Sequence, residues 1–272
     1  MVSSRKRAVT GNHFIELDKD DEGKIYLVIH SGSRNLGGQI FKYYQDLAYK
    51  RCNSFKEEKL ALIKRLKEEG REKEIQSELE KISKPEIKKS MCWLEGDDLK
   101  DYIHDSLMAN KFSHYNKEYL AHKILDKMGI KIISSFESIH NYVDEEGIIR
   151  KGAISAKKGE LIYVALSMKE GGLICEGLSN EDYLCSAPHG AGRLMSRKEA
   201  KENVSIEEFE KSMKGIYSST INKDTIDEAP QAYKKLEHIL PMLEPTAKVL
   251  KHIKPIYTYK EVEKLQPWQR KK

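Results

Sequence analysis

Strand-forming and helix-forming segments occupy separate blocks of this 272-residue chain, and this separation is the strongest constraint on its fold. Short β-rich runs occur at 25–29, between 129 and 190, and at 254–259, whereas 54–128 and most of the chain after 191 have helical character. Segregated blocks are typical of α+β folds, while regular alternation is typical of doubly wound sheets. The sequence therefore predicts an α+β fold with a mixed or antiparallel sheet core and flanking helices.

The stretch 54–128 is interpreted as a helical insertion within a single domain that spans 1–272. In its first half, Leu and Ile recur at three- and four-residue steps among many Lys and Glu residues, which predicts an amphipathic helical hairpin with Gly70 near its turn. Two further helices are expected at 98–110 and 115–128. The nearly balanced charge of the hairpin favours a solvated helix face over an RNA-binding arm.

Composition excludes several classes of protein. Charged residues make up 33% of the chain and no run of eighteen apolar residues occurs, which argues against a transmembrane helix. The basic start lacks the apolar core of a secretory signal. The four cysteines (Cys52, Cys92, Cys175 and Cys185) show no CxxC pairing, so neither a disulfide scaffold nor a zinc knuckle is expected, and the cytoplasm is the expected location. The net charge of +5 permits a nucleic-acid partner without requiring one.

Four histidines stand in contexts that differ from the charged helical surroundings of the other five. They are His13 in GNHF, His30 at the end of the 25–29 run, His140 before Asn, and His189 in PHGAGR. Three neutral imidazoles that converge in the fold could bind a first-row transition metal. Each also has a structural interpretation, since His30 could cap a strand in a plain turn, His13 could lie in a half-buried strand, and His140 could lie in a polar loop.

The segment 186–201 carries the strongest chemical signal. Its small residues would let the backbone approach a ligand closely; they are Gly190, Ala191 and Gly192. Arg193 and Arg197 are four residues apart and are expected on one side of a starting helix, whose N-terminus would favour an anion. A histidine at this position, His189, could then meet a phosphate as nucleophile or acid. The structural alternative is a glycine-rich loop with a helix cap.

These motifs resemble those of the RtcB-type RNA-splicing ligases. The matching strings are GNHFIE (11–16), HSGSRNLG (30–37), HN (140–141), RKGAISA (150–156), SAPHGAGRLMSR (186–197) and DEAPQAYK (227–234). They occur in the order found in the family and extend over nearly the whole chain. The resemblance implies an α+β core of the RtcB type.

The resemblance also implies a reaction. The family joins an RNA end carrying a 3′-phosphate or 2′,3′-cyclic phosphate to a 5′-hydroxyl end in RNA splicing or repair, using GTP, manganese and a histidine–GMP intermediate. By matching motifs, His189 is the expected nucleophile and His13, His30 and His140 are the expected metal ligands. The expected nucleotide contacts are Asn12, Glu16, Asn141, Ser167, Gly190, Ala191, Gly192 and Lys260. Arg34, Arg193 and Arg197 are suited to RNA phosphates, and an archease-type activator is an expected partner.

Two departures from the family pattern qualify these expectations. The family carries an Asp-x-Gly-Cys-Gly segment upstream of GNHF, and this sequence has none, so we expect poor manganese occupancy at one site and weak or absent turnover. The alternative function is that of a truncated, impaired homologue that only binds nucleotide or RNA phosphate. No residue pattern in the sequence indicates a different metal-dependent phosphotransferase.

The second departure is at 165–169, where Ala-Leu-Ser-Met-Lys replaces the family's Pro-Gly-Ser-Met-Gly, which puts nucleotide selectivity in doubt.

Overall fold

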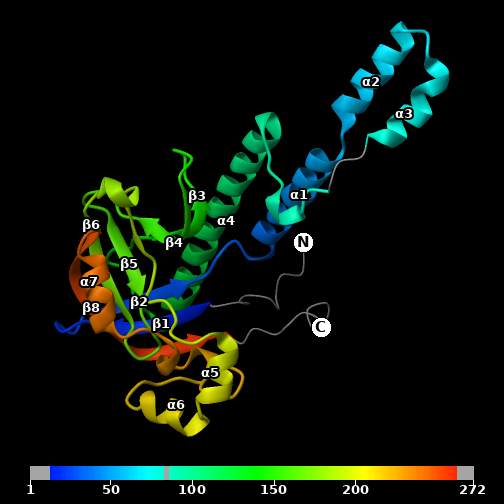
Figure 1. The fold of residues 1–272 in the computed structure, drawn as a ribbon. Helices are drawn as coiled ribbons and strands as arrows, with labels where there is room; N and C mark the ends of the chain where they lie inside the picture. Colours follow the sequence, from blue (N-terminus) through cyan, green and yellow to red (C-terminus); the bar gives the residue numbers. More distant parts are fainter. Residues whose placement is uncertain (1–12, 83–85, 262–272) are drawn as a thin grey trace. The chain divides into compact units, whose positions relative to one another are not determined.

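The structure is a computed structural model that describes residues 13–82 and 86–261, which group into two compact units. The larger unit contains the chain up to Arg34 and from Asn110 onward, and the smaller unit is Asn35–Ala109. Figure 1 follows the chain through its helices and strands.

The larger unit is built on a five-stranded sheet with the order β2-β1-β8-β6-β5 (Figure 1). All of its strand pairs are antiparallel. Its strands are β1 (Phe14–Lys19), β2 (Ile25–His30), β5 (Leu161–Ala165), β6 (Gly172–Gly177) and β8 (Ala247–Lys260). The 14-residue β8 is long enough to pair with β6 along its first half and with β1 along its second half. This register sets Glu16 opposite Thr258 and Phe14 opposite Lys260.

A second, three-stranded sheet has the order β3-β4-β7 and is also antiparallel. Its strands are β3 (His140–Val143), β4 (Ile149–Ser155) and β7 (Ser186–Pro188). His140 pairs with Ile154, and Pro188 pairs with Ala153 on the other side of β4. The central strand β4 therefore holds the His140 and His189 segments on its two edges.

Helix α7 (Leu236–Leu243) packs against the β5–β6 hairpin and closes the main hydrophobic core (Figure 1). Its buried Ile239 and Leu243 join Ile162, Val164 and Leu173 from the two strands. Alternating burial along β5 explains this arrangement, because successive strand side chains point to opposite faces.

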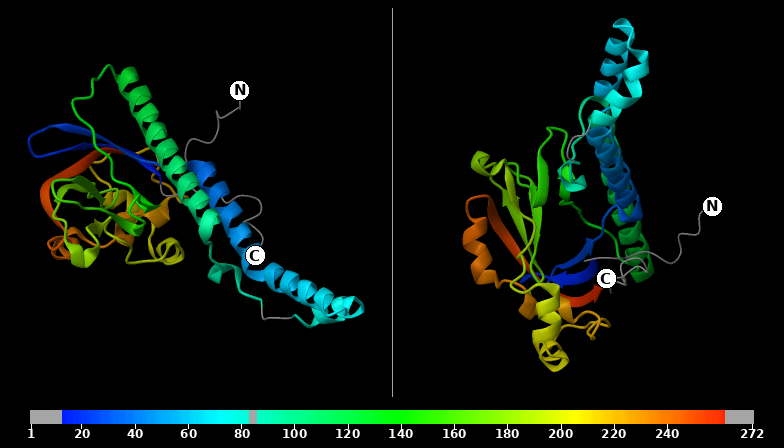
Figure 2. Two further views of the ribbon diagram at one scale, coloured as in Figure 1. Left: turned by 90° about the horizontal axis from the view of Figure 1, so that it is seen from above. Right: turned by 45° about the vertical axis from the view of Figure 1, so that its right-hand side comes forward.

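A smaller core surrounds helices α5 (Arg197–Asn203) and α6 (Ile206–Ser212), which lie beside each other in both views of Figure 2. Both helices begin with a capping box, Ser196 with Glu199 and Ser205 with Glu208, in which the serine accepts from the N3 backbone and the glutamate accepts from the cap backbone. Short 3-10 turns occupy Glu72–Glu74, Lys89–Met91, Glu181–Tyr183, Ile226–Glu228 and Pro230–Ala232.

The smaller unit is helical. Its elements are α1 (Arg34–Asn53), α2 (Lys56–Glu68), α3 (Ile75–Lys81) and the start of α4 (Gly96–Met128). The predicted hairpin turn is confirmed, since Gly70 has a φ of 68° between α2 and α3. The prediction of two helices at 98–110 and 115–128 is wrong, because the intervening residues contain neither Gly nor Pro and α4 continues through them.

The α+β prediction is confirmed. At the start of the β-rich stretch expected between 129 and 190, residues 130–134 have no regular structure. The assignment of 54–128 as an insertion in one domain stays a prediction about domain organisation. Among the described helices, none combines the length and the apolar character that crossing a bilayer requires.

Candidate active site

Four of the nine histidines, distant in sequence, form a row in the larger unit. Ring centroids lie 5.8 Å apart for His13 and His30, 5.3 Å for His30 and His140, and 4.6 Å for His140 and His189. Strand geometry produces the row, because β2 ends at His30, β3 begins at His140 and β7 ends just before His189. The structure therefore brings together the four histidines singled out by sequence context.

The orientation of His189 leaves one ring nitrogen available for chemistry. Its Nδ1 lies 2.7 Å from the carbonyl oxygen of Gly152. A carbonyl can only accept a hydrogen bond, so Nδ1 carries the proton and donates it. In the neutral ring, Nε2 then keeps its lone pair, which is the state required of a nucleophile.

A second hydrogen bond fixes the backbone that orients His189. The side-chain oxygen of Asn141 accepts from the backbone N–H of Gly152 at 3.0 Å. Gly152 has a φ of 67°, and a Cβ at this position would lie 3.6 Å from the His189 ring. Asn141 thus acts on His189 through Gly152.

The donor chemistry of the row suits a transition metal. Burial first, and neighbouring imidazoles second, lower the pKa of His30 to about 3 and that of His140 to about 4. Both rings are therefore neutral near pH 7, as metal ligation requires. His140 Nδ1 is buried without a hydrogen-bond partner in the part of the chain that the structure describes. However, no three or more His, Cys, Asp or Glu side chains among residues 13–82 and 86–261 are grouped so as to hold a metal ion.

A buried lysine lies near one end of the row. Lys260 ends β8 and is 7% exposed, and its Nζ lies 5.2 Å from the ring centroid of Phe14. Phe14 in turn stacks on His30 with centroids 5.1 Å apart. Burial acts to lower the pKa of Lys260, but Tyr233 and Glu228 outweigh it and raise the pKa above its usual value. Lys260 is therefore a buried cation connected to the row through an aromatic ring.

Glu228 organises the cations around this lysine. It is 5% exposed in its side chain and accepts from Lys260 Nζ at 2.8 Å and from the Tyr233 hydroxyl at 2.5 Å. Nη1 of Arg193 lies 3.3 Å and Nη1 of Arg197 lies 3.1 Å from the same carboxylate. Burial acts to raise the pKa of Glu228, but Lys260 and its other partners hold it below the usual value. The carboxylate is therefore ionised and shared among three cations.

Two acidic side chains lie deep on the same face of β1. Glu16 is 3% exposed and accepts from the Thr258 hydroxyl at 2.9 Å, and burial raises its pKa to about 7 against the opposing charge of Lys260. Asp18 is fully buried. Its pKa is raised to about 8, mainly by burial and secondly by the negative charge of the nearby Glu16. Both carboxyl oxygens of Asp18, and the Tyr163 hydroxyl, have no partner within the described residues.

The loop after β5 contacts the His189 segment through its backbone. Ala191 N–H donates to Ala165 O at 2.8 Å, and a Cβ on Gly190 would lie 2.8 Å from the same oxygen. The Ser167 hydroxyl accepts from the backbone N–H groups of Lys169 and Glu170, so it stabilises the turn. The absence of a side chain at Gly190 thus permits the close approach of two backbone segments, and the close approach of residues 190–192 to a ligand stays a prediction.

One local prediction is wrong. Helix α5 begins at Arg197 with Ser196 as its cap, so the helix does not start beside His189, and Arg193 precedes it in an irregular segment. Serine provides the side-chain cap that the glycine loop lacks. Arg193 and Arg197 are nevertheless brought together, by ion pairs to Glu228 and Asp227.

Other expected residues have specific neighbours. Nη1 of Arg34 lies 2.7 Å from Nδ1 of His13, and the guanidinium must be the donor. Asn12 lies outside the described residues. The sequence indicated no role for four further residues of the site, Phe14, Glu228, Tyr233 and Thr258. The DEAPQAYK string could have indicated Glu228 and Tyr233, since both lie in it and both contact Lys260.

The α+β fold thus brings four histidines and a buried lysine into one site. The chain belongs to the tRNA-splicing ligase RtcB family, which matches residues 8–261. It is 29% identical to the RNA-splicing ligase RtcB of Escherichia coli K12 over 93% of this chain and 59% of that protein. It is 25% identical to the tRNA-splicing ligase RtcB of Aeropyrum pernix over 85% of this chain and 53% of that protein. The chain thus spans less than two thirds of the length of these relatives.

Proposed function

We propose that this chain carries the nucleotidyl-transfer site of a GTP- and manganese-dependent RNA ligase. The ligase would join RNA 3′-phosphate or 2′,3′-cyclic phosphate ends to 5′-hydroxyl ends in RNA splicing or repair. The observation that carries the proposal is the hydrogen bond from His189 Nδ1 to Gly152 O, which leaves Nε2 as a nucleophile in the histidine row.

The proposed first step forms a histidine–GMP intermediate. His189 Nε2 attacks the α-phosphorus of GTP, a P–N bond forms, the bond to the β-phosphate oxygen breaks, and pyrophosphate leaves. The ring becomes cationic, and the Gly152 carbonyl that accepts from Nδ1 stabilises that charge. An oxygen of the RNA 3′-phosphate then displaces the histidine, and the 5′-hydroxyl finally displaces GMP.

The proposed nucleotide contacts are Asn12, Glu16, Asn141, Ser167, residues 190–192 and Lys260. Support comes from the buried Glu16 carboxyl and the buried Lys260 ammonium, which would present an acceptor and a donor to a guanine edge. His13, His30 and His140 would hold manganese, which would neutralise triphosphate charge. Arg34, Arg193 and Arg197 would face RNA phosphates, and an archease-type activator and a cytoplasmic location belong to the same proposal.

Ligation of defined RNA ends tests the proposal. One oligonucleotide carries a 3′-phosphate and the other a 5′-hydroxyl, and both are incubated with the chain, GTP and manganese. Because turnover is expected to be weak, we expect a slowly formed joined product that is lost in His189→Ala and kept in His238→Ala, the matched control with an exposed imidazole. Nucleotide binding without any joined product would instead favour the impaired homologue.

A further inference from the structure

Two thiols of the smaller unit lie next to each other where the helical hairpin begins and ends. Cys52 is in the last turn of α1, and Cys92 follows the 3-10 turn Lys89–Met91. Each sulfur is contacted by the residue that follows the other cysteine: Trp93 N–H donates to Cys52 Sγ at 3.4 Å, and Asn53 Nδ2 lies 3.9 Å from Cys92 Sγ. Both cysteines are free and partly exposed.

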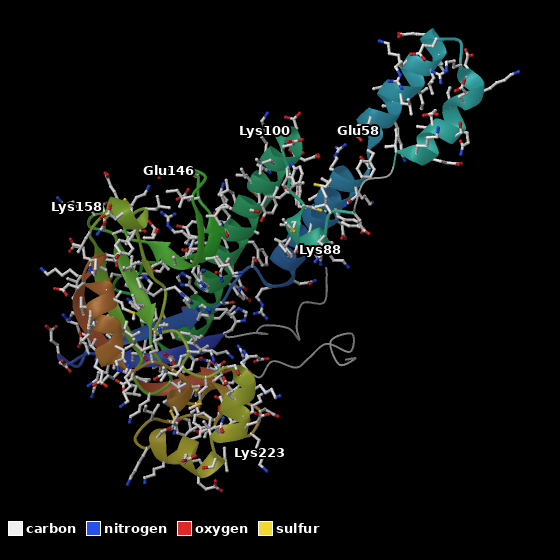
Figure 3. The ribbon with its side chains drawn as sticks, viewed as in Figure 1. Glu58, Lys88, Lys100, Glu146, Lys158 and Lys223 are labelled. Atoms are coloured by element: carbon white, nitrogen blue, oxygen red, sulfur yellow. The ribbon has the colours of Figure 1, made fainter. Side chains whose placement is uncertain are left out.

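Noncovalent contacts hold the two cysteine segments together. The Asn53 side chain pairs with the backbone of Ile87 in both directions, accepting from its N–H at 2.9 Å and donating to its C=O at 3.2 Å. Cys92 Sγ also donates to the carbonyl of Lys88, which Figure 3 labels on this segment. These hydrogen bonds between the two segments therefore keep the two sulfurs near each other.

Neither thiol belongs to the candidate active site, because both lie in the smaller unit while the histidine row lies in the larger one. We propose that Cys52 and Cys92 form a dithiol modification site, which a peroxide or a small-molecule disulfide converts into an intramolecular disulfide. The proposal is independent of the nucleotidyl-transfer function.

The chemistry balances with hydrogen peroxide as the two-electron oxidant. The Cys52 sulfur attacks one peroxide oxygen, the O–O bond breaks, and Cys52 becomes a sulfenic acid as one water leaves. The Cys92 sulfur then attacks the Cys52 sulfur, the S–S bond forms, the S–O bond of the sulfenic acid breaks, and the second water leaves. With oxidised glutathione, Cys52 displaces one glutathione thiol as its S–S bond breaks, and Cys92 then displaces the second glutathione thiol from Cys52. Partial burial and the adjacent Cys52 thiol raise the pKa of Cys92, which assigns the first attack to Cys52.

The new bond would close a covalent loop that contains α2 and α3. Such a loop restricts the unfolded chain more than the folded chain, so oxidation should strengthen the base of the hairpin. Protease cleavage within the residues that join the hairpin to α1 should therefore slow after oxidation.

Thiol counting and peptide mapping of the full chain test the proposal. The reduced protein is treated with dilute hydrogen peroxide, or separately with oxidised glutathione, and is then denatured. We expect the count of free thiols to fall from four to two, a cross-linked peptide pair containing Cys52 and Cys92, and full reversal by dithiothreitol. Cys52→Ser should abolish the cross-link, whereas Cys185→Ser, the matched control with a partly exposed thiol in the larger unit, should keep it.

Several outcomes would overturn the proposal. They are four thiols remaining after treatment, a cross-link to Cys175, Cys185 or a second chain, a stable glutathione adduct on Cys52, or direct conversion of Cys52 to a sulfinic acid. The map of the unsubstituted protein decides among these outcomes even where a variant folds poorly.

Discussion

At the scale of single residues, the buried charges around Lys260 depend on Glu228. Glu228→Gln keeps the shape of the side chain but leaves the Lys260 ammonium without its 2.8 Å carboxylate partner. Breaking a buried ion pair from one side is costly, and we expect a loss of about 2–4 kcal/mol in the free energy of unfolding. Chemical denaturation measures this loss in the free energy of unfolding. The control Glu237→Gln removes an exposed carboxylate 3.9 Å from Lys235 and should change stability by less than about 0.5 kcal/mol. Equal stabilities of the two variants would refute the role of Glu228.

Asp18 should make stability depend on pH. Its pKa is raised from 3.8 to about 8, so between these values the folded chain keeps a proton that the unfolded chain releases. The stability contributed by this proton is complete below pH 3.8 and is lost as the pH rises through about 8. Asp18→Asn cannot ionise, so we expect it to stabilise the chain by roughly 2–5 kcal/mol at pH 8 and by less at pH 5.

Urea denaturation at the two pH values measures this dependence. Asp21→Asn is the control, because Asp21 is exposed in the turn that follows β1. A gain for Asp18→Asn that is the same at both pH values would contradict a protonated, buried Asp18.

At the scale of elements, the contact between β5 and the His189 segment should control the position of the nucleophile. In Gly190→Ala the new Cβ would meet the Ala165 carbonyl oxygen at 2.8 Å, so the segment must shift. Small displacements of a reacting group are costly, and we expect nucleotidylation to slow about 10–100-fold. Rapid-quench labelling measures the rate. Gly38→Ala in α1, where no atom lies within 4 Å, should leave the rate unchanged. An unchanged rate in Gly190→Ala would show that the contact does not position His189.

Elements with a continuous local signal were predictable from the sequence. The β2 run and the Gly70 turn each depend on neighbouring residues, and both are confirmed. The division of α4 failed because polar residues near Asn110 interrupt the apolar period without breaking the helix. The β-branched 130–134 run failed because strand propensity requires a pairing partner, and these residues have none in the described structure.

At the scale of the whole molecule, the sequence could indicate which histidines matter but not how they are oriented. Their contexts are local, whereas the row depends on strand ends from two sheets. Glu228, Tyr233 and Lys260 come from separate elements and meet only in the fold, so residue spacing in the sequence could not predict their contacts. The tautomer of His189 follows only from its contact with Gly152.

The central claim is that His189 Nε2 becomes covalently nucleotidylated, and direct localisation of the adduct tests it. The folded chain is incubated with α-labelled GTP and manganese, and the protein-bound label is mapped by mass spectrometry. We predict one acid-labile GMP adduct on His189, present in His238→Ala and absent in His189→Ala. A folded chain that takes up no label, or a GMP adduct on Lys260 or another residue, would contradict the account.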